Sequence, residues 1–310
     1  MHLADLCATI NTMEKIRGIL LVALGAASYG VLATFVKIAH DQGYHTGEIT
    51  FSQFFIGFVV LLIMGLFGKK QKNVSPAGDK NPQLKMLLAG TSLGLTSTFY
   101  YLSVQYLPVS VCIILLMQTV WMGIILEWVL TRQVPETKKI IAALIVIAGT
   151  LLATNIFDTR VSFNGRGLIF GLLSAMSYTV AMYSSNKVAL HLPGVKRSMY
   201  LVLGGLLAII IFWNVELIQH FNFSVIWKWG AFLALFGTIL PPLLFTKGLP
   251  KTSIGLGSIV SSVEIPVSIL FAHFILNETV MPLQWAGVAL IILAIAAMNL
   301  RFKSGSSNRP

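Results

Sequence analysis

Few side chains in this chain combine reactive chemistry with an apolar setting, and Glu264 is the foremost of them. It lies inside an apolar stretch, with Gly257, Ser261 and Ser268 at helical spacing on the same face. A charge in the middle of a membrane span costs about 2.5–3.5 kcal/mol on insertion scales, so a retained one is read as functional. A carboxyl group shielded from water is also easier to protonate. We therefore expect Glu264 to bind an amine or to carry a proton; the alternative is a structural glutamate bonded between helices.

Aromatic and polar residues in other apolar stretches are further candidates for binding a small molecule. Gln118 has Trp121 three residues on; the amide can donate and accept hydrogen bonds, and the indole can stack on a flat ligand. Tyr100 has Ser97 one turn before it and Ser103 one turn after it. For each of these residues, packing between helices is the alternative interpretation.

Two more tyrosines lie in a repeated pattern. Ala26-Ala27-Ser28-Tyr29 returns as Ala175-Met176-Ser177-Tyr178 about 150 residues later, and the apolar runs that contain them begin at Gly18 and Gly167 with identical spacing. Tyr29 and Tyr178 are therefore expected at equivalent positions of two copies, across from each other. Hydroxyl groups on rings that face a pocket favour an amphipathic ligand.

Composition indicates which elements must position these residues. The chain is 56% hydrophobic and 11% charged, with a mean hydropathy of +0.81, whereas a soluble domain has about 25% charged residues. A helix needs about 20 apolar residues to cross a bilayer. The sequence predicts an all-α integral membrane protein with ten transmembrane helices, at 16–39, 48–68, 84–106, 109–130, 137–156, 165–188, 198–217, 227–248, 253–275 and 281–300.

The repeat and the helix count together predict an inverted architecture. Each copy contains five helices, and because five is odd the second copy enters the membrane from the opposite side. Two inverted five-helix repeats are typical of secondary transporters that alternate access around a midplane site. The predicted organisation is an N-terminal extension at 1–14, a first repeat at 15–156, a second repeat at 165–303 and a tail at 304–310. Met13 is a natural alternative start of translation.

The basic residues predict the orientation. The net charge of +11 could indicate nucleic acid, but the basic residues form short clusters between apolar runs and no continuous stripe, so no nucleic-acid partner is expected. Eighteen of the 22 fall on one side of the predicted helices, and the other side has only Lys37, Arg160, Arg166 and Lys228. The side rich in Lys and Arg is cytoplasmic. Both termini are therefore expected in the cytoplasm, with the protein in the cytoplasmic (inner) membrane.

Paired turns extend the repeat. Leu107-Pro108-Val109-Ser110 precedes the fourth predicted helix and Leu249-Pro250-Lys251-Thr252 the ninth, which contains Val263-Glu264-Ile265-Pro266 and leaves through Leu276-Asn277-Glu278-Thr279. With the paired Ser-Tyr, these features resemble the drug/metabolite transporter superfamily, with two EamA-type repeats over 15–303. That family usually has Gly-Glu at the exit of the ninth helix and often an arginine early in the second, where Gln53 stands here.

The resemblance implies transport of small metabolites through a cavity lined by helices one, three, four, six, eight and nine, with no metal or organic cofactor. Lys37, near the outer end of helix one, is expected to snorkel to the interface, or else to meet a substrate carboxylate or Glu264. Gly90-x-x-x-Gly94 allows close helix approach. The substrate-binding residues expected from the sequence are Tyr29, Gln53, Ser97, Tyr100, Gln118, Trp121, Tyr178, Ser261 and Glu264.

The function expected from these features is secondary transport. The chain lacks the metalloprotease, hydrolase-elbow and Walker motifs, so an enzyme is not expected. We expect export of an amino acid or related amphipathic compound by alternating access, with protons as a candidate coupling ion and the lipid bilayer as the surroundings. A channel and a non-transporting scaffold or sensor are the alternatives. The sequence does not decide the oligomeric state, and a monomer is compatible with it.

Overall fold

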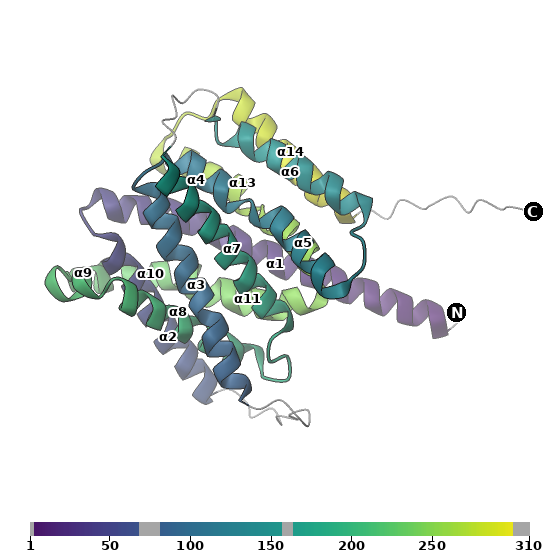
Figure 1. The fold of residues 1–310 in the computed structure, drawn as a ribbon, viewed down its shortest axis with the longest axis horizontal. Coiled ribbons are helices and arrows are strands. Elements are labelled where there is room, and N and C mark those ends of the chain that lie inside the picture. Colours follow the sequence, from purple (N-terminus) through teal and green to yellow (C-terminus); the bar gives the residue numbers. More distant parts are fainter. Residues whose placement is uncertain (1–2, 68–80, 157–163, 300–310) are drawn as a thin grey trace, which may run out of the picture.

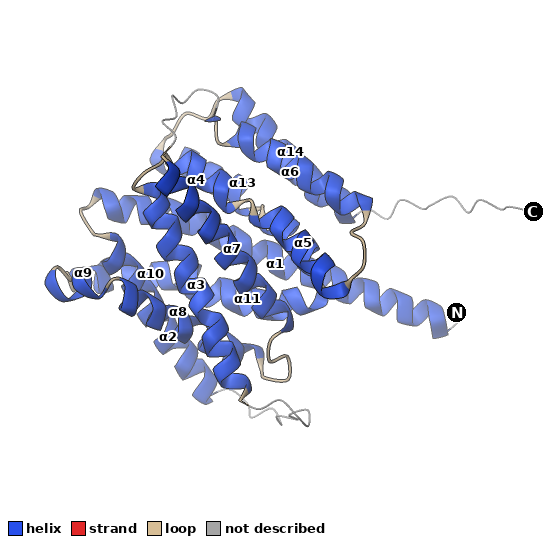
Figure 2. Ribbon diagram, in the orientation of Figure 1, coloured by secondary structure: helices blue, strands red, loops and turns tan. Residues whose placement is uncertain are grey.

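The computed structural model describes residues 3–67, 81–156 and 164–299 (Figure 1). Every element among these residues is a helix, and none is a strand (Figure 2). The order is α1 (Leu3–Asp41), α2 (Thr46–Phe67), α3 (Pro82–Val104), α4 (Val109–Leu116), α5 (Thr119–Thr131), α6 (Thr137–Ala153), α7 (Gly165–Lys187), α8 (Gly194–Phe212), α9 (Asn214–Gln219), η2 (Ile226–Gly230), α10 (Ala231–Ala234), η3 (Leu235–Ile239), α11 (Leu240–Gly248), η4 (Leu249–Lys251), α12 (Ile254–Ser261), α13 (Glu264–Leu276) and α14 (Pro282–Asn299).

Several of the helical stretches match the thickness of a membrane. Seven of those described are long and apolar enough to cross one: Thr12–Asp41, Thr46–Phe67, Val109–Thr131, Gly165–Lys187, Gly194–Phe212, Ile226–Lys251 and Ile254–Leu276. Large apolar side chains such as Leu66, Ile211 and Trp227 are exposed on the outside of the bundle. Lipid, rather than water, is the medium that suits such a surface.

The first and second halves of the chain interlock. α3 packs against both α7 and α8, α5 packs against α12, and α1 runs along α11 and α13. α6 and α14, which are far apart in sequence, lie side by side at one edge of the bundle (Figure 1). The N-terminal part of α1 extends beyond the other helices (Figure 1). The residues of the candidate site therefore come together from both halves.

Glycine lets α3 and α8 approach each other closely. A methyl group at Gly90 would collide with the carbonyl of Leu201, and one at Gly94 would collide with the carbonyl of Gly205. Small residues four apart are the usual means by which membrane helices pack backbone to backbone. The close approach expected of Gly90-x-x-x-Gly94 is thus observed, and it occurs within the chain.

The fourth and ninth predicted helices are both interrupted. Each was expected to be continuous, but each breaks after eight residues, at Met117–Gln118 between α4 and α5 and at Ser262–Val263 between α12 and α13. The parts match in length: α4 and α12 have eight residues, and α5 and α13 have 13. Both second parts end at a left-handed residue, Arg132 with φ 58° and Asn277 with φ 53°. The two halves therefore share this interruption.

Side chains take over the hydrogen bonds that each break removes. At the first break the amide of Gln118 donates to the carbonyl of Ile114 at 2.9 Å. At the second the N–H of Ser262 turns to the carbonyl of Ile259, and the hydroxyl of Ser261 donates to the carbonyl of Ser258 at 2.7 Å. An unpaired carbonyl in lipid costs several kcal/mol, so these side chains make the breaks tolerable.

The helix from Ile226 to Lys251 contains two π-helical turns, η2 and η3. Pro241 and Pro242 follow η3 directly and have no N–H to donate to the preceding turn, so the regular α-helical ladder cannot continue through them. Thr238 and Ser28 brace this region, because the Thr238 hydroxyl donates to the Gln53 carbonyl at 2.8 Å and the Ser28 hydroxyl to the Phe236 carbonyl at 2.8 Å. π-Bulges are frequent at functional sites.

Candidate functional site

Glu264 lies at the break between α12 and α13, in the interior of the bundle. It is the first residue of α13, and its backbone carbonyl packs so closely on α1 that only glycine fits at Gly30. Its side chain is partly buried. Among the residues that the structure describes, its carboxyl group makes no ion pair and no hydrogen bond. Its role toward a ligand stays a prediction.

Three tyrosines lie near enough to this carboxyl group to feel its charge. It lies within electrostatic range of the hydroxyl groups of Tyr29, Tyr100 and Tyr178. The rings of Tyr29 and Tyr178, which the repeat places at equivalent positions, meet edge to face with centroids 6.3 Å apart. Phe245 of α11 contacts Tyr29 in the same manner at 6.0 Å. Tyr178 is 3% exposed; its hydroxyl lies near the side chain of Ser261 but makes no hydrogen bond of normal length and geometry to a described group.

A small cavity opens beside these rings. Its walls come from α1, α3, α7, α8 and α11, and its lining residues are Tyr29, Leu93, Tyr178, Ala181, Met182, Ser185, Leu201, Pro242 and Phe245. It is of a size to hold about one water molecule. The aromatic and apolar lining suits the body of an organic molecule, but in this conformation the cavity is too small to hold one.

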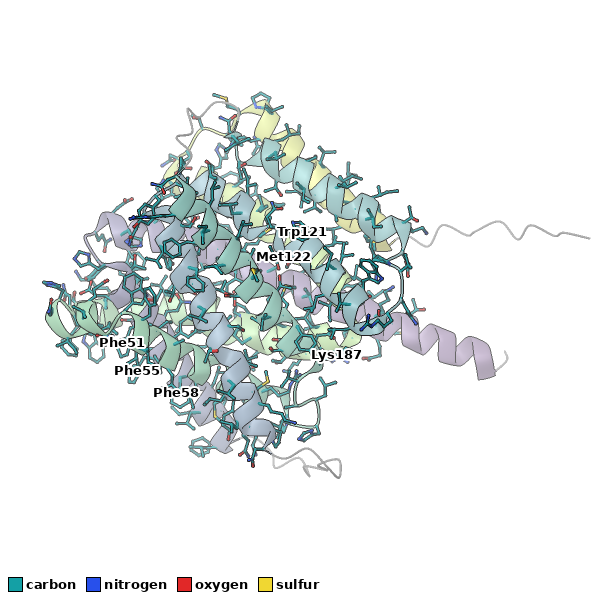
Figure 3. The ribbon with its side chains drawn as sticks, in the orientation of Figure 1. Phe51, Phe55, Phe58, Trp121, Met122 and Lys187 are labelled. Atoms are coloured by element: carbon teal, nitrogen blue, oxygen red, sulfur yellow. The ribbon has the colours of Figure 1, made fainter. Side chains whose placement is uncertain are left out.

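The remaining predicted site residues lie partly near Glu264 and partly at the other helix break. Ser261 is fully buried next to Glu264, and its hydroxyl donates to the carbonyl of Ser258 at 2.7 Å. Ser97 and Tyr100 are partly buried on one face of α3. Gln118 accepts a hydrogen bond from the indole of Trp121 at 2.7 Å, and Trp121 lies on α5 beside Met122 (Figure 3). Trp121 and Gln118 therefore bond to each other. Their role toward a substrate stays a prediction.

Gln53 of α2 is buried next to the π-turn η3. A side chain at Gly237 would collide with its amide and with Leu32, one turn beyond Tyr29 on α1. The chain thus places a neutral amide against the deformed helix. The position contributes no positive charge to the interior.

Ion pairs hold the ends of the helices, away from Glu264. Lys37 pairs with Glu278, just after α13, and Lys251 pairs with Glu14 of α1. Lys37 therefore does not pair with Glu264. Glu127 accepts from Lys139 at 2.7 Å and from the backbone N–H of Gly255 at 2.7 Å, which ties together α5, α6 and α12. Each of these lysines already has a carboxylate partner.

Arg197 is a buried charge that the sequence pattern did not single out. It is 2% exposed and donates to four backbone carbonyls: Ser185 at 2.7 Å, Thr246 at 2.8 Å, Val188 at 3.1 Å and Ser184 at 3.3 Å. These carbonyls lie at the ends of α7 and α11, where a helix carries partial negative charge. Arg197 therefore caps two helices at once.

Glu48 is the counterpart of Arg197 in the first half of the chain. It is 1% exposed and accepts the N–H of His45 at 2.8 Å and that of Asn222 at 2.6 Å. Glu48 and Arg197 have the same separation in sequence as Tyr29 and Tyr178. Extending the repeat into the starts of α2 and α8 is the signal that would have found both.

Comparison with known proteins agrees with this architecture. The model of the EamA-like transporter family matches residues 16–155 and again residues 165–300. The chain belongs to the EamA-like transporter family. The family resemblance expected from the sequence motifs is thereby confirmed, and the chain is a multi-pass membrane transporter.

Similar transporters match most of the chain. An uncharacterized transporter of Archaeoglobus fulgidus is 24% identical over 278 residues, which cover 88% of this chain and 93% of that protein. The uncharacterized transporter YetK of Bacillus subtilis is 27% identical over 249 residues, which cover 77% of this chain and 74% of that protein. A solved structure described only as the crystal structure of a protein shares the fold, with a TM-score of 0.69, 15% identity and coverage of 93% and 96%.

Proposed function

We propose that this chain is a secondary transporter that moves a small amphipathic metabolite, an amino acid or a related compound, across the cytoplasmic membrane by alternating access. The observation that carries the proposal is the unpaired carboxyl group of Glu264 at a broken helix, among the hydroxyl groups of three tyrosines. Transporters of this type build midplane sites from discontinuous helices. Export is the proposed direction.

The proposed topology has ten spans in two inverted repeats. α3, α6 and α14 join the seven apolar stretches as the remaining spans, five in each half. The matching breaks and the matching positions of Glu48 and Arg197 support the repeat. Glu14 and Lys37 lie about 34 Å apart along α1 at 1.5 Å per residue. That distance is close to the thickness of the hydrocarbon core, so their ion pairs would lie at the two membrane surfaces.

The proposed motion is a rocking of helices around Glu264. α1 is tied to the ninth helix at both ends, through Glu14 to Lys251 and through Lys37 to Glu278, so that these helices would move as one body. α6 and α14 pack on each other at the edge and would act as static supports. The small cavity beside Tyr178 would widen into the substrate site as the helices separate.

Flux measurements in proteoliposomes test this function. Saturable flux is expected of a carrier, whereas a channel gives linear flux and a scaffold gives none. A thermal-shift screen against a metabolite library identifies compounds to load, because a ligand that binds the folded state raises its apparent stability. Discovery of a substrate whose flux rises linearly without limit would contradict alternating access.

The Glu264→Gln variant tests the role of the carboxyl group. The amide keeps the shape but can neither ionise nor pair with a cation, so we expect transport and its dependence on pH to be lost. Glu136→Gln removes an acid from an exposed loop position and serves as the matched control. If the Glu264 variant transports with the pH profile of the unmodified protein, proton coupling through this residue is wrong.

A further inference from the structure

Among the described residues, the candidate site has a free acidic group but no free basic group. Glu264 is an acid in the interior without a partner among the described residues. Arg197 is the only buried basic residue in the part of the chain that the structure describes, and its donors all end on backbone carbonyls. Lys37 pairs with a carboxylate at the end of the bundle. The interior therefore offers a ligand one negative charge and no available positive charge.

This imbalance discriminates between ligand charges. A zwitterion would bring its own carboxylate into a low-dielectric site that already holds one, and like charges at such distances repel strongly. An amine without a carboxylate neutralises Glu264 and leaves no charge unpaired. Gln53, which is buried in the same interior, is neutral and offers no positive charge to a carboxylate.

The aromatic side chains favour the same ligand class. The rings of Tyr29, Tyr178 and Phe245 meet edge to face, so their faces are turned in different directions around the cavity. Ring faces attract cations by about 0.5–2 kcal/mol each. The hydroxyl of Tyr178, which makes no hydrogen bond of normal length and lies near Ser261, adds an acceptor for an N–H group. Leu93 and Met182 supply an apolar wall for the rest of the molecule.

We propose that the site selects an organic cation: an amphipathic amine with one positive charge and no carboxylate. The proposal rests on the proposed transport function and narrows its substrate class. The amine binds the carboxyl group of Glu264, the tyrosine rings surround it, and the apolar body lies along the cavity wall.

Matched ligand pairs that differ by one carboxylate test this selectivity. Tyramine is compared with tyrosine, and phenethylamine with phenylalanine, on the full chain in lipid nanodiscs by thermal shift and calorimetry. Each amine is expected to bind tighter than its amino acid by about tenfold or more. Glu264→Gln is expected to abolish amine binding, and Glu136→Gln to leave it unchanged.

Folding of the variant does not limit the test. If Glu264→Gln does not fold, Glu264→Asp takes its place, because aspartate keeps the negative charge but holds it one methylene further from the ligand. Weaker amine binding is then expected. Undiminished amine binding contradicts the proposal. Amino acids that bind as tightly as their amines, or amines that do not bind at all, also overturn it.

Flux of the same four compounds in proteoliposomes separates the two proposals. Saturable flux of the amino acids without the amines overturns the cation site and leaves the transport function standing. Amines that bind through Glu264 but are not carried across contradict the transport function and support the cation site. Saturable flux of the amines alone supports both.

Discussion

Replacing Arg197 with methionine is expected to destabilise the protein strongly without touching the candidate site. The guanidinium is 2% exposed and bonds four carbonyls, three at the end of α7 and one near the end of α11. Methionine keeps most of the aliphatic volume and removes every donor. The two helix ends then lose their common cap, and their carbonyls lie in an interior that water does not reach.

The size of the loss follows from those bonds. A hydrogen bond with a charged partner contributes about 1.5–3 kcal/mol, so four of them amount to roughly 6 kcal/mol or more. Burying the charge of Arg197 costs several kcal/mol, and the methionine variant avoids that cost. We expect a net loss of about 3 kcal/mol. Arg197→Lys should lose about half as much, because one ammonium group cannot reach both helix ends as the planar guanidinium does.

Equilibrium unfolding in mixed detergent micelles, followed by helical circular dichroism, measures these differences. Lys196→Met is the matched control, since it removes a charge one position earlier on α8 from a partly exposed side chain. Its effect should stay within about 0.5 kcal/mol. The reasoning fails if Arg197→Met loses less than about 1 kcal/mol, or no more than the Lys196 variant.

Two further predictions use the same assay. Gly94→Ala puts a methyl group against the carbonyl of Gly205 and should destabilise the protein by about 1–3 kcal/mol. In the control Gly65→Ala the methyl group would touch only one sulfur atom, at 3.8 Å, so this variant should be more stable by up to about 1 kcal/mol. Equal effects of the two substitutions would contradict the close packing of α3 and α8. The side chains of Lys37 and Glu278 are 55% and 46% exposed, so their ion pair should contribute little to stability. A double-mutant cycle with Gln at both positions should give a coupling energy below about 1 kcal/mol, which falls further in about 1 M salt. A coupling energy that salt does not reduce would refute this prediction.

The sequence predicts helices best where lipid is the surrounding medium. The expected spans 48–68 and 165–188 agree closely with Thr46–Phe67 and Gly165–Lys187. The expected span 198–217 is displaced, because the helix begins at Gly194 and ends at Phe212. Hydropathy treats Arg197 as a loop residue, whereas the protein buries it by satisfying its donors with backbone carbonyls. Burial within protein is not visible in the hydropathy of the sequence.

The candidate site could be predicted only in part, because the hydrogen-bond partners of its side chains depend on the fold. The repeat predicts equivalent positions for Tyr29 and Tyr178, but not that their rings touch. The break before Glu264 has a cue in Pro266, which removes a backbone donor. The matching break at Gln118 has no proline, and there a side-chain amide compensates the free carbonyl instead. Which partner an amide chooses depends on the fold, so the bond from Trp121 to Gln118 could not be separated from ligand binding in advance.

The hydrogen bonds that cross between the two matched halves make each half incomplete by itself. The N–H of Asn222 ends on Glu48, and the hydroxyl of Ser103 ends on the carbonyl of Gly167. The hydroxyl of Thr238 ends on the carbonyl of Gln53. A half that folded alone would leave these groups unpaired in a medium without water. Two fragments cut between the halves are therefore expected to be unstable apart and to reassemble when they are made together, as complementing pieces of one domain.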